Sequence, residues 1–381
     1  MEAYKKKIFL HVNYTPSDPS IGITKKINGQ ILALQNLGLD VTYTTYSSKG
    51  IEIINNDNDC VYIKKFRLMN EKYKLVVRRF LLIKASIDYV KNNNFDLGYL
   101  RFTGFDWIYI KMLSLMKKRG MKVIVESLSY FPGIKYKSLK GRYLLLTTKL
   151  LEKKAKRYID LVAAEGDFKE LWGVKALSFE NGVVVNNFRP HSYIGSKNEI
   201  HFISVGNEMD YHGYDRIVKS IHEYYKNNGN LIIKLHLVGV VKKQTKELVD
   251  KLKLQDIVFF YGKKYGKELE DIYDQCNIGV GPLAQYRIGG KKVTGLKTKE
   301  YFAKGIPYIF SGGELLLSDS YPYVMKIPDN DEYIDMNKVI KFYNSIKSDK
   351  HLVANMRKFA KENFSWDTCM KRIINELNDN D

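Results

Sequence analysis

The sequence predicts an α/β protein made of two doubly wound, Rossmann-like domains. With 381 residues, the chain is longer than one typical hydrophobic core requires. Short apolar runs alternate with segments of helical periodicity in both halves, which is the pattern of parallel sheets covered by helices. The Asn-rich stretch at 181–187, followed by Arg189 and Pro190, is typical of a linker. We therefore expect an N-terminal domain over residues 1–188 and a C-terminal domain over residues 189–361.

The first half opens with a strand–helix–strand unit. Lys7–Val12 is an apolar run that predicts a buried parallel strand, residues 24–40 have helical spacing, and Val41–Tyr46 predicts the next strand. This order implies a parallel sheet. Further strands are predicted at 61–63, 97–100, 122–126, 160–164 and 176–180, and further helices at 72–92, 105–119 and 141–157.

The second half repeats this alternation. His201–Gly206 predicts a strand that ends in glycine, and an apolar run that starts at Pro307 predicts the last strand of the half. Between them, strands are predicted at 231–239, 257–261 and 278–282, and helices at 215–227, 242–252 and 267–276. The tail over about 336–377 is predicted to be helical.

Composition limits the partners and the compartment. Lys and Arg total 62 against 42 acidic residues, so the net charge is +20 and an anionic partner is expected. No nucleic-acid-binding motif occurs, so nucleic acid is not the expected partner. Cys60, Cys276 and Cys369 form no metal-spaced pair and fit a reducing cytoplasm. The N-terminal apolar run is too short for a signal peptide, and no apolar stretch reaches the about 18 residues of a membrane span.

Gly289–Gly313 is the most informative segment of the chain. A glycine-broken basic loop leads into a short helix that stops at Gly305, and a strand follows. The start of a helix offers unpaired N–H groups that suit a phosphate. Glu300, one turn in, can accept two hydroxyl hydrogen bonds from a ribose. Together these features indicate a nucleotide site, although an ordinary αβ unit with a surface glutamate is the alternative.

The segment resembles the donor site of the retaining glycosyltransferases of the two-Rossmann (GT-B) type, in the large bacterial superfamily of glycogen synthase-like and mannosyltransferase-like enzymes (glycosyltransferase family 4-like, group 1). The matching residues are Leu296, Lys297, Glu300, Tyr301, Ala303, Gly305 and Pro307. The resemblance implies two domains that face a central cleft, with a last helix over about 362–381 packing back on the first domain. It also implies hexosyl transfer with retention from a nucleotide diphosphate sugar, expected to be UDP-linked, to a glycan or lipid-linked acceptor in cell-surface polysaccharide or glycoconjugate synthesis. No metal or other cofactor is expected, and the three Asp-x-Asp triplets fall in polar turns or at residues 379–381.

The resemblance assigns roles around the donor. The backbone N–H groups of Gly295 and Leu296 would bind the distal phosphate, and Lys297 would add charge near it. Glu300 would accept from the ribose hydroxyls. Arg287 would join Lys297 in stabilising the leaving diphosphate, because arginine binds oxyanions bidentately.

Two departures from the family pattern stand out in this half. Relatives carry a cation pair after the glycine that ends the strand, whereas this chain has Asn207 and His212 after Gly206. We expect these three residues to bind the donor through hydrogen bonds, with Arg216 restoring a positive charge or, alternatively, being a solvated helix residue. The acid usually found before Glu300 is replaced by Lys292, which would bind phosphate or an acidic donor sugar unless the loop is shifted.

The first domain would supply the acceptor side. Gly22 opens a helix and could let the backbone approach the diphosphate. Lys25 on that helix, and Arg101 after the strand at 97–100, are candidate acceptor-binding residues. Glu126 ends a strand and would contact the acceptor or act as its general base, with a turn-capping role as the alternative.

Two basic segments with leucines, residues 72–84 and 141–158, suggest peripheral contact with an anionic membrane on its inner face. The alternative is a domain helix with a solvated basic face. Other functions also stay open. Lys292, in place of the usual acid, favours a non-catalytic GT-B homologue. A sugar-nucleotide epimerase would need further acid and base groups. A dehydrogenase would need a G-x-G-x-x-G motif, and none follows the first strand.

Overall fold

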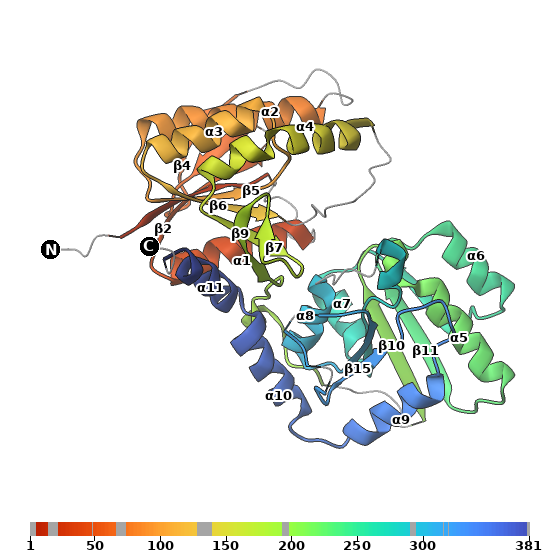
Figure 1. The fold of residues 1–381 in the computed structure, drawn as a ribbon. Helices are drawn as coiled ribbons and strands as arrows, with labels where there is room; N and C mark the ends of the chain where they lie inside the picture. The colour runs from red at the N-terminus through yellow and green to blue at the C-terminus, as the bar shows by residue number, and fades with distance from the viewer. Residues whose placement is uncertain are drawn as a thin grey trace. The chain divides into compact units, whose positions relative to one another are not determined.

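The computed structural model describes residues 5–13, 22–47, 49–65, 74–127, 139–192, 198–289, 295–314, 316–318 and 320–378. The chain forms two compact units (Figure 1): unit 1 is Met1–Phe179 with Cys369–Asp381, and unit 2 is Glu180–Thr368. The predicted domain boundary after residue 188 lies later in the chain than this division. The reason is that Val183 pairs with Ser365 and is buried in the core of unit 2.

Unit 1 is built on one largely parallel sheet. In sheet order its strands are β4 (Cys60–Lys64), β3 (Gly50–Ile54), β2 (Asp40–Ser47), β1 (Lys7–His11), β5 (Leu97–Arg101), β6 (Lys122–Ser127), β7 (Leu161–Glu165), β9 (Val174–Phe179) and β8 (Glu170–Leu171). The six central strands, β2, β1, β5, β6, β7 and β9, are parallel. At the edges of the sheet, β3, β4 and β8 form antiparallel pairs. The apolar residues of β5, β6 and β7 are buried, as parallel strands between helices must be.

Helices cover both faces of this sheet. Helices α2 (Lys74–Asn92), α3 (Trp107–Lys118) and α4 (Leu139–Ala155) lie together on one face, and α1 (Gly22–Asn36) lies on the other (Figure 1). Helix α11 (Trp366–Asn378) begins in unit 2 and continues into unit 1. The sequence did not indicate β3 or β8, because β3 folds back on β2 as an antiparallel hairpin and β8 has two residues.

Unit 2 has a fully parallel sheet among its described residues. In sheet order its strands are β12 (Val258–Gly262), β11 (Ile232–Val238), β10 (Glu199–Val205), β13 (Ile278–Val280), β14 (Tyr308–Ser311) and β15 (Val324–Ile327). Its helices are α5 (Tyr214–Lys226), α6 (Lys243–Lys251), α7 (Gly266–Tyr273), α8 (Leu296–Lys304), α9 (Met336–Ile346) and α10 (Leu352–Phe359). The prediction of two doubly wound α/β units is confirmed.

The strand order of unit 2 places its ligand edge. The chain starts the sheet at β10, adds strands on one side to β12, and then returns to the other side of β10 with β13. In such sheets, ligands bind beyond the carboxyl ends of the two strands where the order reverses. The connections that follow β10 and β13, together with the start of α8, therefore form the edge at which a ligand is expected.

Glycines let the strand ends approach one another at this edge. Gly206, after β10, and Gly239, after β11, have φ angles of +124° and +123°. The Gly206 N–H donates to the Val238 carbonyl at 2.8 Å, and the Gly239 N–H donates to the Gly262 carbonyl at 2.7 Å. A Cβ at Gly239 would lie 2.4 Å from the Gly206 carbonyl oxygen, so no other residue fits there without moving the backbone.

We predict that Gly239→Ala lowers the free energy of unfolding by roughly 2–4 kcal/mol, because the new methyl group meets backbone atoms and φ is strained. Gly262→Ala is the matched control: its φ is +64°, but no atom lies within 4 Å of the added Cβ. The control should cost about 1 kcal/mol. Urea denaturation of both variants would measure the difference, and equal losses would contradict the close approach.

Candidate functional site

The amino end of α8 is fixed over the two central strands. The Tyr301 hydroxyl donates to the Ile203 carbonyl of β10 at 2.9 Å and lies 3.2 Å from the Val280 carbonyl of β13. Gly295 is the N-cap residue, and a Cβ there would meet only the Lys297 Cγ at 3.9 Å. The first N–H groups of the helix have no intrahelical partner. Gly295 and Leu296 are partly exposed.

Lys297 is a buried cation in the first turn of this helix. Its Nζ lies 3.1 Å from the Ser204 hydroxyl at the end of β10, and a Cβ on Gly206 would lie 4.0 Å from its Cε. Within the described part of the chain, no carboxylate lies within ion-pair distance of its Nζ, and the residue is 8% exposed. Burial lowers its pKa to about 7, although the charge of Glu300 opposes the shift. The position therefore combines helix N–H groups with an ammonium that lacks an anion.

His212 adds a neutral donor near Lys297. The Met209 N–H donates to its Nδ1 at 3.2 Å, so hydrogen bonding assigns the ring proton to Nε2. Burial, followed by the charges of Lys297 and Lys242, lowers the pKa of His212 to about 2, and the ring stays neutral. Asn207 is exposed, and its Oδ1 accepts from the Val240 N–H at 3.1 Å. Both residues lie in the β10–α5 connection, where the sequence analysis expected them.

Arg216 is engaged within unit 2, and its predicted contact with the donor stays a prediction. Its guanidinium is buried, and it donates to the carbonyls of Glu332, Leu283 and Pro328 at 2.7–2.8 Å. A further hydrogen bond of 3.0 Å reaches the Asn330 Oδ1. These contacts tie the start of α5 to the segment after β15, which is a structural role.

Arg287 is also engaged within the protein. It makes two parallel hydrogen bonds to the Asp215 carboxylate, at 2.7 and 3.0 Å, and one to Asp331 at 2.7 Å. Its remaining N–H groups donate to the Tyr286 hydroxyl at 2.9 Å and the Asp210 carbonyl at 3.3 Å. All five N–H groups of an arginine side chain are then used, and the hydrogen bonds to Asp215 raise its pKa further. In this structure Arg287 therefore forms an ion pair that holds this loop, and its predicted catalytic role stays a prediction.

Glu300 lies on α8 one turn beyond the amino end and is partly exposed. Its charge raises the pKa of Lys297, which places the two side chains near each other. Its predicted contact with ribose stays a prediction. Lys292 lies outside the described residues.

In unit 1, Arg101 and Glu126 are neighbours at the carboxyl ends of β5 and β6, where they are register partners. Glu126 is fully buried, and its Oε1 lies 2.9 Å from the Lys26 Nζ and 3.2 Å from the Gln30 Nε2. Burial raises the pKa of Glu126, but the charges of Lys26 and Arg101 outweigh this effect, and the pKa is lowered. A lowered pKa makes a weak base, so the contacts favour a positioning role over proton transfer.

This group still has unused polar atoms. Four buried atoms of this group make no hydrogen bond to the described residues, namely Gln30 Oε1, Arg101 Nη1, Glu126 Oε2 and Ser127 Oγ. Gly22 begins α1, and Lys25 is exposed on that helix. The adjacent Lys26, rather than Lys25, makes the buried ion pair with Glu126.

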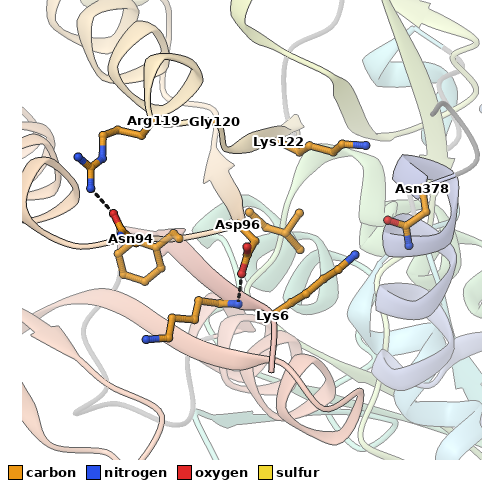
Figure 2. A pocket seen from close by; sticks show the side chains of 10 residues that line it. Lys6, Asn94, Asp96, Arg119, Gly120, Lys122 and Asn378 are labelled. Atoms are coloured by element: carbon orange, nitrogen blue, oxygen red, sulfur yellow. Dashed lines mark hydrogen bonds between the residues drawn. The ribbon is translucent and has the colours of Figure 1, made fainter. Parts of the chain in front are cut away.

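A pocket of about 540 Å³ lies at the opposite, amino edge of the unit 1 sheet (Figure 2). Lys6, Asp96 and Lys122, at the starts of β1, β5 and β6, line it together with Asn378 of α11. The Lys7 N–H donates to the Asp96 carboxylate at 2.7 Å. None of the predicted site residues lines this pocket. Across the described ranges, no group of three or more His, Cys, Asp or Glu side chains could hold a metal ion.

Comparisons with known proteins match this geometry. Residues 190–316, which include the α8 site, match the family described as glycosyl transferases group 1. A glycosyltransferase from Rickettsia africae has a TM-score of 0.67 and 16% identity, with 99% of each chain covered. WaaG, a glycosyltransferase involved in lipopolysaccharide biosynthesis, has a TM-score of 0.60 and 11% identity, with 97% of this chain and 99% of that chain covered. The pneumococcal O-GlcNAc transferase GtfA, in complex with UDP and GlcNAc, has a TM-score of 0.50 and 14% identity, with 89% of this chain and 69% of that chain covered. No curated protein matches the sequence. The fold is therefore GT-B.

We predict that Lys297→Met removes a pH dependence of stability. The pKa of Lys297 is about 7 in the folded protein against an ordinary 10.5, so between these values the unfolded chain binds a proton that the folded chain does not. Wild-type stability should therefore rise with pH across this window relative to Lys297→Met, by about 1.4 kcal/mol for each pH unit at most.

Urea denaturation at a series of pH values between 7 and 9.5 would measure this difference. Lys25→Met, at an exposed position on α1, is the control and should show no such trend. A difference between wild type and Lys297→Met that does not change with pH would contradict the unpaired buried state.

Proposed function

We propose that this protein is a glycosyltransferase that moves a sugar from a nucleotide diphosphate sugar to an acceptor hydroxyl. The observation that carries the proposal is the Lys297 ammonium at the amino end of α8, at the switch point of the unit 2 sheet. It is buried, and no carboxylate of the described residues pairs with it. The family match over residues 190–316 supports it, because the matched region contains this site. A diphosphate would supply the missing negative charge.

Different residues of the α8 site would bind different parts of the donor. The N–H groups of Gly295 and Leu296 and the Lys297 ammonium would bind the distal phosphate, and the His212 Nε2–H would add an uncharged donor. Glu300 would accept hydrogen bonds from the ribose. As the glycosidic bond breaks, negative charge grows on the diphosphate, and these fixed donors stabilise it. We propose retention of configuration, a UDP-linked hexose and no required metal.

Protonation of Lys297 is part of this mechanism. With a pKa of about 7, the free site is partly uncharged at neutral pH. The donor diphosphate favours the charged form, so its binding would raise the pKa of Lys297 and take up a proton. The charge is then present when the leaving group needs it.

We propose that the acceptor hydroxyl is presented by unit 1 from a glycan or a lipid-linked glycan, in cell-surface polysaccharide or glycoconjugate synthesis. Arg101 and Ser127 offer unused donors and Glu126 an unused acceptor oxygen at the carboxyl ends of β5 and β6. The role of WaaG in lipopolysaccharide biosynthesis supports an acceptor of this class. The lowered pKa of Glu126 argues against the epimerase alternative, which needs a side chain that exchanges protons with the sugar.

We further propose that the protein acts in the cytoplasm, at the inner face of an anionic membrane. Helix α4 exposes Tyr143, Leu146 and Leu150 along one stripe, and the exposed fraction of Leu150 is 70%. On the neighbouring α3, Trp107 is 67% exposed, and the Lys154 Nζ lies 4.5 Å from its ring centroid. Exposed apolar and aromatic side chains flanked by lysines suit the interface of an anionic bilayer. Along the chain that the structure describes, no helix combines the length and apolar character needed to cross a bilayer.

We predict that a UDP-sugar raises the Tm of the wild-type protein and that this shift is lost in Lys297→Met and reduced in Glu300→Ala. Binding should weaken by up to about tenfold for each pH unit above pH 7, since Lys297 must then be protonated on binding. Thermal-shift titrations with UDP, GDP and ADP sugars would measure both effects, with Lys25→Met as the control.

Product analysis completes the test. Transfer to an acceptor would identify an enzyme, conversion of the donor sugar alone would identify an epimerase, and nucleotide binding without turnover would identify a non-catalytic homologue. Unchanged donor binding by Lys297→Met would contradict the proposed site.

For the membrane, we predict that Leu146→Glu/Leu150→Glu reduces binding to phosphatidylglycerol vesicles by about tenfold or more, because two charges enter the apolar stripe. Tyr333→Glu, at a 60% exposed position in unit 2, is the matched control and should bind as wild type does. Vesicle co-sedimentation would measure this, with phosphatidylcholine vesicles as the neutral reference. Equal binding to both lipids, or equal loss in the control, would contradict the proposal.

A further inference from the structure

Helix α8 carries a second buried lysine that faces away from the ligand edge. Lys299 is 0% exposed, and its Nζ contacts the Glu180 carboxylate and lies 2.8 Å from the Glu314 carboxylate. The Tyr308 hydroxyl donates to Glu314 at 3.3 Å. Burial lowers the pKa of Lys299, but the charges of Glu314 and Glu180 outweigh that effect and raise it, so the ammonium stays charged.

The two partners of Lys299 come from distant parts of the chain. Glu180 is the first residue of unit 2, directly after the chain leaves unit 1. Glu314 follows β14, after Gly312 and Gly313. The Leu316 N–H also donates to Glu180 at 3.0 Å, so the Glu180 carboxylate joins the post-β14 segment to the first crossing.

The second crossing of the chain lies at the same place. The Val183 N–H donates to the Phe364 carbonyl at 2.7 Å, and Gly182 packs so closely on the Trp366 ring that a Cβ there would lie 2.6 Å from it. The Lys299 Nζ lies 4.0 Å from the centroid of the Phe364 ring. One ammonium on α8 therefore touches the segments next to both places where the chain passes between the units.

Such a group is not explained by stability alone. Three charges in a buried site pay a desolvation cost, and well-packed neutral side chains of similar volume are often as stable. The buried ion pairs instead restrict the relative positions of Lys299, Glu180 and Glu314, because each charge must keep its partner within hydrogen-bonding distance. Lys299 lies four positions after the N-cap Gly295, so the triad is about one helical turn from the start of α8.

We propose that Lys299 is a positioning residue that fixes the nucleotide-binding end of α8 to the two chain crossings, so that ligand occupancy at α8 and the order of the crossing segments depend on each other. The ligand part of this inference rests on the proposed function. Lys299 itself contacts no ligand in this scheme, and it acts through the position of Gly295, Leu296 and Lys297.

The test uses a variant that removes the charges together, Lys299→Met/Glu180→Gln/Glu314→Gln, so that no unpaired carboxylate is left buried. The control is Lys304→Met/Glu270→Gln, which removes the ion pair of 2.6 Å between the buried Lys304 of α8 and the partly exposed Glu270. Hydrogen exchange of ligand-free protein is the first readout. In the triple variant, amides of 295–300 and 180–188 should both exchange about tenfold faster or more, and in the control neither should.

UDP is the probe for the second readout. In the wild type, UDP should slow exchange in 295–300 and in 180–188, and the triple variant should bind UDP about tenfold more weakly by calorimetry. Exchange in the triple variant no faster than in the control, or UDP protection confined to 295–300, would overturn the inference. Absence of UDP binding by the wild type would instead overturn the nucleotide assignment, and the ligand-free exchange would still decide the role of Lys299.

Discussion

The site depends on the Tyr301 hydroxyl, which bridges the carbonyls of Ile203 and Val280. These two carbonyls belong to β10 and β13, the strands between which the sheet order of unit 2 reverses. A helix held at this point must place its amino end over the switch, and the Lys297 side chain then reaches Ser204. Because the Tyr301 side chain is fully buried, breaking this bridge would leave its hydroxyl without an acceptor, so the position of α8 is strongly determined.

The alternation of strands and helices could be predicted because it follows from the local spacing of apolar residues. The apolar residues of β1 and β6 are buried in the structure, and helix α5 forms at the position predicted for it. The residues at the start of α8 could be placed for a related reason, since Gly295, Lys297 and Glu300 take their positions from one short helix. Strands β3 and β15 escaped notice because their short runs gain their order from neighbouring strands.

The contacts that could not be predicted join side chains that are distant in sequence. Arg216 and Arg287 lie where a phosphate ligand was expected, but Pro328 and Asp331, more than forty residues away from either, accept their hydrogen bonds. No spacing rule reveals such partners before the sheet is assembled. Lys299 was missed for the same reason. Its surroundings in sequence read as an exposed basic helix, and only the fold brings two carboxylates to it.

The division of unit 1 into two separated stretches has a consequence for how the molecule is made. Helix α11 contributes Met370, Ile373 and Leu377 to buried positions of unit 1, and Lys175 pairs with Glu376. On the ribosome, these residues emerge only after all of unit 2 has been translated. Unit 1 therefore completes its packing last, although most of its sheet is synthesised first. Until α11 has been made, the apolar surface that this helix covers stays exposed, and the nascent chain is prone to aggregation.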